Sequence, residues 1–465
     1  MRRVLTCPGI VRLSLGMSCM ALLFWCKTIQ AQEFLENEAP PPASVQESKT
    51  PMDEAFKKPA ERTPLLTGVK EKMKDETPFI RDTRIDVNPR TYYFHQAPFT
   101  DNIKEAWAIG GSIAYRSGYL FDHFGVGAAA YTSQALHAPD DRDGTLLLKP
   151  EQTGYAVLGQ LYGDIRLVDD MHLYLFRKEY DTPYINKNDT RMTPNTFEGY
   201  TLVGRYSGAS GVPAIRYGAG YITRIKKRNS DDFVPMSVAA GVDKVDRGVA
   251  LTGANYSTDK YSIGAINYYS NDIINIFYTE GKCLLPAIQK LGFLVSAQLS
   301  DQRSTGDNLI TGNDFSGHQV GFKAEASYEG AVLTFAYTNT TKGTDMRSPW
   351  SGYPGYTSVQ VQDFNRAGEE ATMIKVSSHL SRFGFKGVTI YGLWVHGWGA
   401  VDSVSRTPVY NQDEYDIDLQ WRPKIVDFLK GFWFRTRYAY VDQRGAGNSS
   451  VNDFRIIVNY DLPLL

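Results

Sequence analysis

Two arginines near the end of the chain, Arg435 and Arg437, have the type and spacing to bind an anion. If this segment is a β-strand, residues two apart share one face and stand about 7 Å apart. Each guanidinium group can hold a carboxylate through charge-assisted, often bidentate hydrogen bonds. The pair could therefore pass a carboxylate-bearing molecule from one group to the next. Asp416 and Asp418 on the preceding segment allow internal salt bridges instead, and both roles can hold together.

A third arginine, Arg191, lies in a long predicted loop just before Pro194. A proline-stiffened loop could fold inward and present this charge at a narrow point, whereas a salt bridge to Asp189 or to the wall is the competing interpretation. Alternation along the predicted strands turns further basic side chains toward the polar face. These additional pore-lining candidates are Arg90, Arg205, Arg216 and Arg455. Some of them could instead lie in the headgroup zone and contact lipopolysaccharide.

The sequence contains few features that are typical of a catalytic site. The sequence has no His-Glu-x-x-His, no phosphate-binding loop and no Gly-x-Ser-x-Gly elbow, and its seven histidines are dispersed. Asp140–Gly144 hints at a calcium loop, but Pro139 and Pro150 interrupt the register, so an acidic turn is the better interpretation. The sequence therefore predicts no catalytic residues, no cofactor and no metal site.

The elements that must position these residues are strands. In Phe432–Tyr440 the aromatic side chains alternate with Arg435 and Arg437, so one face suits lipid and the other water. The same alternation recurs along the chain. It predicts eighteen strands, at 84–95, 105–117, 123–134, 153–166, 170–178, 196–206, 212–224, 245–257, 259–270, 272–281, 290–301, 316–328, 330–341, 369–381, 387–400, 412–423, 430–442 and 451–461.

Composition agrees with an all-β protein. Of 465 residues, 13% are aromatic and 41 are glycine, which favours strands and tight turns. Past the first 30 residues no apolar run approaches the roughly 18 residues of a membrane-spanning helix. Tight and long connections alternate, and a β-sheet in hydrocarbon must close on itself. We predict a closed antiparallel transmembrane β-barrel, with a soluble sandwich or propeller as the lesser alternative.

The N-terminal part has a different character. Basic residues precede an apolar stretch at Leu13–Cys26, and the small residue Ala31 follows at the end of the segment. Residues 1–31 are therefore predicted to be a signal peptide. It contains three of the four cysteines, which leaves Cys283 without a partner for a disulfide. Residues 32–81 are rich in proline and charge and read as a flexible periplasmic segment, with a short helix between Leu65 and Asp75 as the less favoured alternative. Residues 82–465 are the barrel.

Three stretches resemble the OprD family of substrate-selective outer-membrane porins. Arg84–Phe94 is similar to the family's first strand, and Asn188–Gly199 to its Asp-x-Arg-hydrophobic-x-Pro-x-x-Phe-x-Gly signature. Lys430–Tyr460 is similar to the last two strands. The resemblance implies an eighteen-stranded barrel with inward loops, an arginine ladder on one wall and acidic or tyrosyl groups opposite. The proline-rich N-terminal segment and the terminal Asp461–Leu465, which lacks an aromatic end, depart from the pattern.

The family resemblance implies passive uptake of small carboxylate-bearing nutrients, such as amino acids or aromatic acids, across the outer membrane of a Gram-negative bacterium. A barrel hydrolase is one rival, for which His379 beside Ser377 is the nearest fragment. A structural or adhesive barrel is the other. The expected partners are small solutes, the lipid bilayer with lipopolysaccharide and the outer-membrane assembly machinery, in a monomer or homotrimer. The whole chain has a net charge of −1, and residues 1–31 carry four basic residues and no acid, so the mature chain has a net charge of −5, which disfavours nucleic acid.

Overall fold

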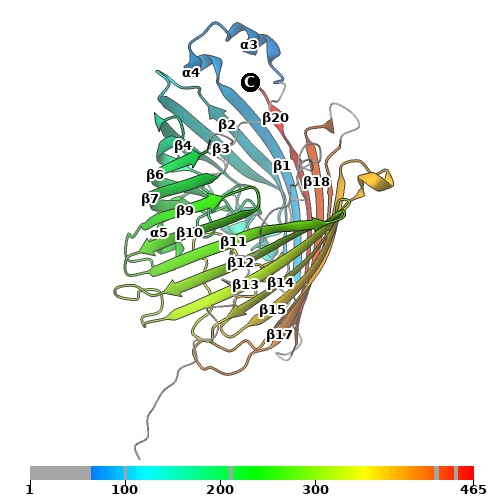
Figure 1. The fold of residues 1–465 in the computed structure, drawn as a ribbon. Coiled ribbons are helices and arrows are strands. Elements are labelled where there is room, and N and C mark those ends of the chain that lie inside the picture. Colours follow the sequence, from blue (N-terminus) through cyan, green and yellow to red (C-terminus); the bar gives the residue numbers. More distant parts are fainter. Residues whose placement is uncertain (1–63, 99–101, 209–212, 424–428, 445–448) are drawn as a thin grey trace, which may run out of the picture. The chain divides into compact units, whose positions relative to one another are not determined.

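A computed structural model describes residues 64–98, 102–208, 213–423, 429–444 and 449–465. The predicted signal peptide and residues 32–63 of the predicted flexible segment lie outside these ranges. The described chain forms one antiparallel sheet in which each long strand pairs with the next long strand. The first long strand also pairs with the last, through Arg90↔Asn459 to Pro98↔Val451, and this pairing closes the barrel. Figure 1 shows the strands in chain order.

Eighteen long strands make up the wall, which confirms the predicted closed barrel. They are β1 (Arg84–Pro98), β2 (Lys104–Arg116), β3 (Phe124–His137), β4 (Tyr155–Val168), β5 (Met171–Lys178), β6 (Thr196–Ser207), β7 (Ala214–Lys226), β9 (Val249–Ser257), β10 (Tyr261–Ser270), β11 (Ile274–Ile288), β12 (Leu291–Arg303), β13 (Ser316–Tyr328), β14 (Ala331–Thr340), β15 (Glu370–His379), β16 (Val388–Trp398), β17 (Asn411–Trp421), β18 (Phe432–Arg444) and β19 (Ser449–Tyr460). Two short strands, β8 (Phe233–Pro235) and β20 (Leu462–Pro463), pair with β7 and β1.

The predicted strands match the observed ones to within a few residues, except at β11. That strand extends to Ile288, seven residues beyond the predicted end, because β12 continues to pair with it through Leu284↔Leu294 and then across a bulge. The helical elements are short. They are α3 (Thr67–Lys72), α4 (Pro78–Arg81), α5 (Met236–Ala239), η1 (Asp140–Arg142), η2 (Pro150–Gln152) and η3 (Leu380–Phe383). None of the helices in the described ranges is long and apolar enough to cross a membrane.

The two faces of the wall follow the sequence alternation. Phe322, Ile417 and Tyr438 point outward and are 45%, 57% and 40% exposed. Asp416 and Asp418 point into the barrel and are buried. An apolar exterior with a polar interior is the pattern of a barrel surrounded by lipid.

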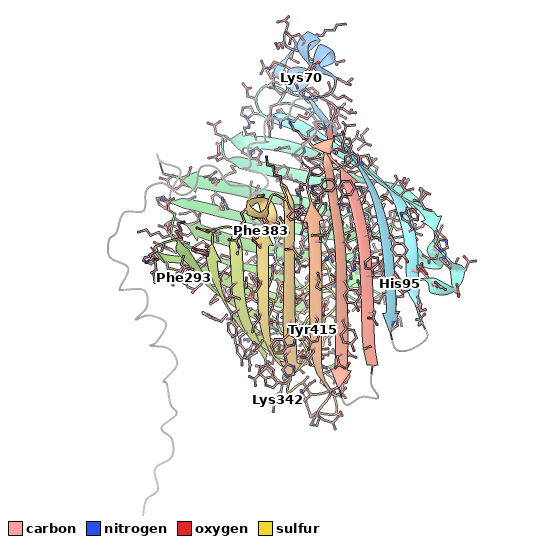
Figure 2. All side chains as sticks on the ribbon, turned by 90° about the vertical axis from the view of Figure 1, so that its right-hand side faces the viewer. Lys70, His95, Phe293, Lys342, Phe383 and Tyr415 are labelled. Carbon is pink, nitrogen blue, oxygen red and sulfur yellow. The ribbon has the colours of Figure 1, made fainter. Side chains whose placement is uncertain are left out.

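Long connections gather at one end of the barrel and short turns at the other. The long ones are loop L2 (residues 138–154), L3 (179–195), L4 (227–248) and L7 (341–369), and they contrast with turns as short as 289–290 and 329–330. Figure 2 shows Lys342 of L7 and Lys70 of α3 at opposite ends. Since outer-membrane barrels have long extracellular loops and short periplasmic turns, the end with L7 is extracellular.

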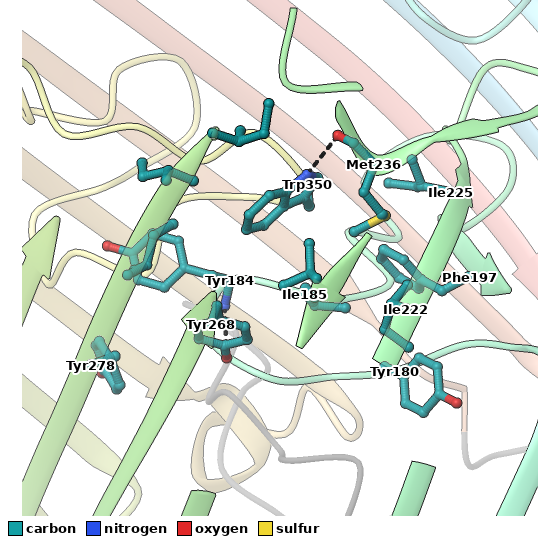
Figure 3. Packing of buried hydrophobic residues seen from close by; sticks show 14 of the residues in the cluster. Tyr180, Tyr184, Ile185, Phe197, Ile222, Ile225, Met236, Tyr268, Tyr278 and Trp350 are labelled. Atoms are coloured by element: carbon teal, nitrogen blue, oxygen red, sulfur yellow. Dashed lines mark hydrogen bonds between the residues drawn. The ribbon is translucent and has the colours of Figure 1, made fainter. Parts of the chain in front are cut away.

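Three of these loops fold into the barrel and pack on its inner wall. Tyr184 of L3 donates to Ser300 Oγ of β12 at 2.8 Å, and its backbone N–H donates to Tyr268 Oη of β10 at 3.3 Å. Trp350 of L7 donates through Nε1 to the carbonyl of Met236 of L4 at 2.9 Å. Figure 3 shows these side chains in one apolar cluster, which narrows the interior and fixes the loops that line it.

Candidate functional site

L3 is tied to the wall by an ion pair. Arg90 of β1 donates through Nη1 and Nη2 to the two carboxylate oxygens of Asp189, at 2.6 and 3.0 Å. The same Nη1 donates to the carbonyl of Arg191 at 2.5 Å. The bidentate geometry fixes the orientation of L3 as well as its position. Arg90, a predicted lumen residue, therefore holds the backbone that carries Arg191.

Arg191 makes no ion pair with any described residue. Its Nε donates to the carbonyl of Thr145 and its Nη1 to the carbonyl of Thr190, both at 2.8 Å, and its guanidinium lies 4.9 Å from the ring centre of Phe94. The salt bridge to Asp189 that the sequence allowed is not formed, because Arg90 binds that carboxylate. The charge of Arg191 is thus held in place by neutral groups.

A second arginine without an ion pair in the described ranges, Arg228, comes from L4. Its Nη1 donates to Asn188 Oδ1 at 3.0 Å and to Thr190 Oγ1, so it too is held by neutral groups of L3. It lines a cavity of about 390 Å³ between L3, L4 and L7, together with Trp350. The space beside this guanidinium could receive a solute.

Burial and like charges act on both arginines. Burial lowers the pKa of Arg191 well below its usual value, and the positive charges of Arg455 and Arg228 lower it further. Burial and the charge of Arg455 lower the pKa of Arg228 to about 10. The three guanidinium groups therefore repel one another, and an anion between them would relieve the repulsion.

The wall arginines, in contrast, have carboxylate partners. Arg435 and Arg437 both lie in the lumen and share Asp418 Oδ2, at 2.7 and 2.8 Å. Arg455 binds the two carboxylate oxygens of Asp453, at 2.6 and 2.9 Å. The internal salt bridges allowed by the sequence are formed for Arg435 and Arg437, and their side chains remain partly exposed to the lumen.

L7 is held by a row of inward carboxylates. Glu414 of β17 accepts the backbone N–H groups of Val361 and Gln362, at 2.7 and 2.8 Å. Asp416, a predicted pore-lining residue, accepts the N–H of Gln360 at 3.3 Å. These bonds compensate for the buried carboxylates and leave the loop in the lumen. Asp416 therefore positions a loop here.

The tip of L7 also binds β19. It contains a carboxylate, Asp363, that has no ion-pair partner among the described residues. Gln360 donates through Nε2 to Asp453 Oδ1 at 2.8 Å. Nearby Asp363 is exposed to the lumen and accepts a hydrogen bond from Ser358 Oγ at 2.7 Å, but it makes no ion pair with any described residue. Its enclosed position raises the pKa of Asp363, while the Ser358 bond and the charge of Arg228 oppose the rise.

Arg205 and Arg216 are not brought to this region. They lie opposite each other on β6 and β7, near the ends of these strands that meet the turn 208–213. That is the periplasmic end, below the level of L3. These two predicted pore-lining residues therefore lie at the periplasmic end of the lumen.

Sequence reasoning missed Arg228, Asp363 and Glu414. Arg228 ends the run Lys226–Arg228 directly after a predicted strand, which is a signal that could have marked it. Glu414 continues the inward alternation of Asp416 and Asp418. Asp363 carries no comparable signal, because its place depends on how a long loop folds.

The fragment considered for a hydrolase does not assemble. His379 Nδ1 lies 2.9 Å from Thr389 Oγ1 on the neighbouring strand. No hydrogen bond between His379 and Ser377 is found. The His379 side chain thus interacts with Thr389 on the neighbouring strand of the wall.

Comparison with known proteins identifies the family. A sequence model described as outer membrane porin, OprD family, matches residues 77–464. The chain is 23% identical over 424 residues to Porin D of Pseudomonas aeruginosa, covering 83% of this chain and 92% of Porin D. Similar solved structures include OccK9 of P. aeruginosa, with a TM-score of 0.73 and 22% identity, and OccAB3 of Acinetobacter baumannii, with 0.74 and 18%. OpdK of P. aeruginosa with vanillate has a TM-score of 0.70 at 19% identity.

Each of these three structures matches 83% of this chain and 100% of the other. At this identity they establish the fold, and the family match establishes the class of protein. The chain belongs to the OprD family of outer-membrane porins, and it is a channel of the Gram-negative outer membrane rather than an enzyme.

Proposed function

We propose that this porin takes up small carboxylate-bearing solutes, which bind at Arg191 and Arg228 as they pass L3. The observation that carries the proposal is the difference between these two arginines and those of the wall. Arg191 and Arg228 make no ion pair with a described carboxylate, whereas Arg435, Arg437 and Arg455 do. A solute carboxylate would supply the missing negative charge.

The wall arginines would extend the path. Each already shares its charge with an aspartate, so it would attract a carboxylate less strongly and release it more easily. Conduction requires binding that is favourable enough for entry and weak enough for exit. A solute would leave Arg191 for the partly compensated Arg437 and Arg435, whose side chains stay partly exposed.

Asp363 favours solutes that also carry an amino group. Its carboxylate is close enough to Arg228 for the two charges to interact, but it makes no ion pair with a described residue. An ammonium group could bind there while the solute's carboxylate binds the arginines. Amino acids fit this arrangement, and the solved neighbour that contains vanillate shows that a related barrel can hold an aromatic acid.

Liposome swelling with propionate, propionamide and alanine tests the proposal. These solutes have nearly the same size and differ in carboxylate and ammonium charge. The wild-type channel should admit propionate and alanine faster than propionamide, and Arg191→Gln should slow the charged solutes about tenfold, the effect of about 1.4 kcal/mol. Arg303→Gln, which changes an arginine paired with Asp301 outside the lumen, is the matched control. Equal rates for propionate and propionamide in the wild type would refute the proposal.

A further inference from the structure

The C-terminal tail completes a part of β1 that the last long strand leaves open. β1 pairs with β2 from Arg84 onward, but with β19 only from Arg90 onward. On the open side, β20 pairs with β1 through Asp86↔Pro463 and Val87↔Leu462. An unpaired strand edge exposes backbone donors and acceptors, so the tail covers an edge beside the closing seam of the barrel.

The last two residues continue this coverage. Leu464 N–H donates to the carbonyl of Ile85 at 2.8 Å, and Leu465 N–H donates to the same carbonyl at 3.3 Å. In return, Ile85 N–H donates to the carbonyl of Leu465 at 3.4 Å. The chain end is thus laid along the first strand.

A segment that precedes β1 binds the other side of the tail. Leu65 N–H donates to the carbonyl of Pro463 at 2.9 Å, and Leu66 N–H to the carbonyl of Leu464 at 3.0 Å. The tail therefore lies between β1 and residues 65–66. Figure 1 shows α3, α4 and β20 together at the same end of the barrel, beside the C-terminus.

The same segment is fastened to the barrel at a second point. Lys70 of α3 donates through Nζ to the carbonyls of Arg81 and Thr83, at 2.9 and 2.8 Å, which closes residues 64–83 into a compact unit. Gly118, in the turn between β2 and β3, donates to the carbonyl of Phe79 at 2.9 Å. The unit is anchored on one side by the barrel and holds the tail on the other.

We propose that residues 64–83 form an N-terminal latch that holds the C-terminal tail on β1 and slows the opening of the β1–β19 seam. A strand pair at the seam can separate only after the tail has left β1. The tail in turn leaves only after its bonds to Leu65 and Leu66 break. The latch therefore acts on the rate of unfolding and leaves the lumen unchanged.

Removal of a single backbone hydrogen-bond donor tests this proposal. Leu66→Pro removes the N–H that binds Leu464. Leu66→Ala also removes apolar surface from this side chain, but it keeps the N–H. The readout is the rate at which the folded barrel, which migrates faster on a detergent gel than the unfolded chain, disappears at a fixed elevated temperature. We expect Leu66→Pro to unfold about tenfold faster and Leu66→Ala to stay near the wild-type rate. A wild-type rate for Leu66→Pro, or equal acceleration by both variants, would overturn the proposal.

A cross-link gives a second test that does not depend on Leu66→Pro folding. Leu66→Cys with Leu464→Cys, in a Cys283→Ser background, places two thiols on residues joined by a backbone hydrogen bond. The disulfide should form, and the oxidised barrel should unfold more slowly than the same sample after reduction. Single-channel conductance should be the same in both states. Absence of the disulfide, or equal unfolding rates with and without reductant, would contradict the latch.

Discussion

Arg90 on the first strand holds Asp189 on L3 through a bidentate ion pair, although the two residues are 99 positions apart in the chain. The pair is partly buried, with 16% and 33% of the two side chains exposed. Because Arg90 also binds the carbonyl of Arg191, a wall residue determines where the loop arginine stands. The position of the proposed carboxylate site thus depends on a contact outside the site.

Arg90→Gln should therefore loosen L3 and widen the channel. The expected result is a higher single-channel conductance and a weaker preference for propionate over propionamide, because Arg191 is no longer fixed. Asp189→Asn should give the same phenotype, and the double variant should be no worse than either single one, since both remove the Arg90–Asp189 ion pair. Arg177→Gln, which breaks the Arg177–Glu198 ion pair between β5 and β6, is the control. Additive effects of Arg90→Gln and Asp189→Asn would contradict this coupling.

Glu414 should control the position of L7 in the same way. Its carboxylate accepts two backbone N–H groups of the loop, and the amide in Glu414→Gln has only one acceptor oxygen. We expect larger and noisier single-channel currents as the loop leaves the wall. Glu370→Gln is the matched control, since that carboxylate accepts a bond from Tyr337 rather than from L7. Quiet, wild-type currents in Glu414→Gln would show that other contacts suffice to hold the loop.

The wall of this barrel could be predicted from the sequence because alternation is local. The inward register of Arg435 and Asp418 follows from residues two apart, and strand ends follow from nearby Gly, Asn and Asp. The contacts that hold the inward loops on the wall join distant segments, such as Arg90 with Asp189 and Val361 with Glu414. Alternation places the two wall residues inside the lumen, but it carries no information about which loop they bind.

The N-terminal segment shows the same limit. Residues 67–72 form α3, the alternative that the sequence favoured less. None of its residues is buried, so no apolar periodicity marks it. The residues just before α3, Leu65 and Leu66, bind the other end of the chain through backbone hydrogen bonds, and such bonds leave no pattern in side-chain types.

Replacing Arg435 and Arg437 should affect both transport and stability. Both bind Asp418, whose side chain is fully buried, so Arg435→Gln with Arg437→Gln leaves a buried carboxylate without its cations. Loss of a buried ion-pair partner costs about 3–5 kcal/mol of unfolding free energy. Addition of Asp418→Asn should recover much of that stability while propionate uptake stays reduced by about tenfold.

Thermal unfolding and liposome swelling, measured on the double and triple variants, separate the two effects. Propionamide uptake should be nearly unchanged in the triple variant. Recovery of propionate uptake together with stability would show that the two arginines serve only the structure.

The channel should become more anion-selective as the pH falls. The pKa of Asp363 is raised by its enclosed position, so its carboxylate becomes neutral at a higher pH than the usual value of about 3.9, while Arg191 and Arg228 keep their charge. Reversal potentials in a salt gradient should record this shift, and Asp363→Asn should show the acid-like selectivity at neutral pH. An unchanged pH dependence in Asp363→Asn would assign the titration to another group.

The stability effect of Asp363 has a defined sign. Because the folded-state pKa is higher than the unfolded-state pKa, the folded protein binds more protons between the two values. The free energy of unfolding therefore decreases as the pH rises through this interval. Asp363→Asn should be at least as stable as the wild type at pH 7, as measured by thermal unfolding.

Interruption of single-channel current by a solute tests the carboxylate site most directly. Propionate added to the extracellular side should interrupt the wild-type current, whereas propionamide should not. With Arg191→Gln and Arg228→Gln combined, the interruptions by propionate should become at least tenfold shorter or disappear, while Arg303→Gln keeps them. Interruptions of wild-type length in the double variant would contradict the account, because they would show that the two loop arginines do not bind the carboxylate.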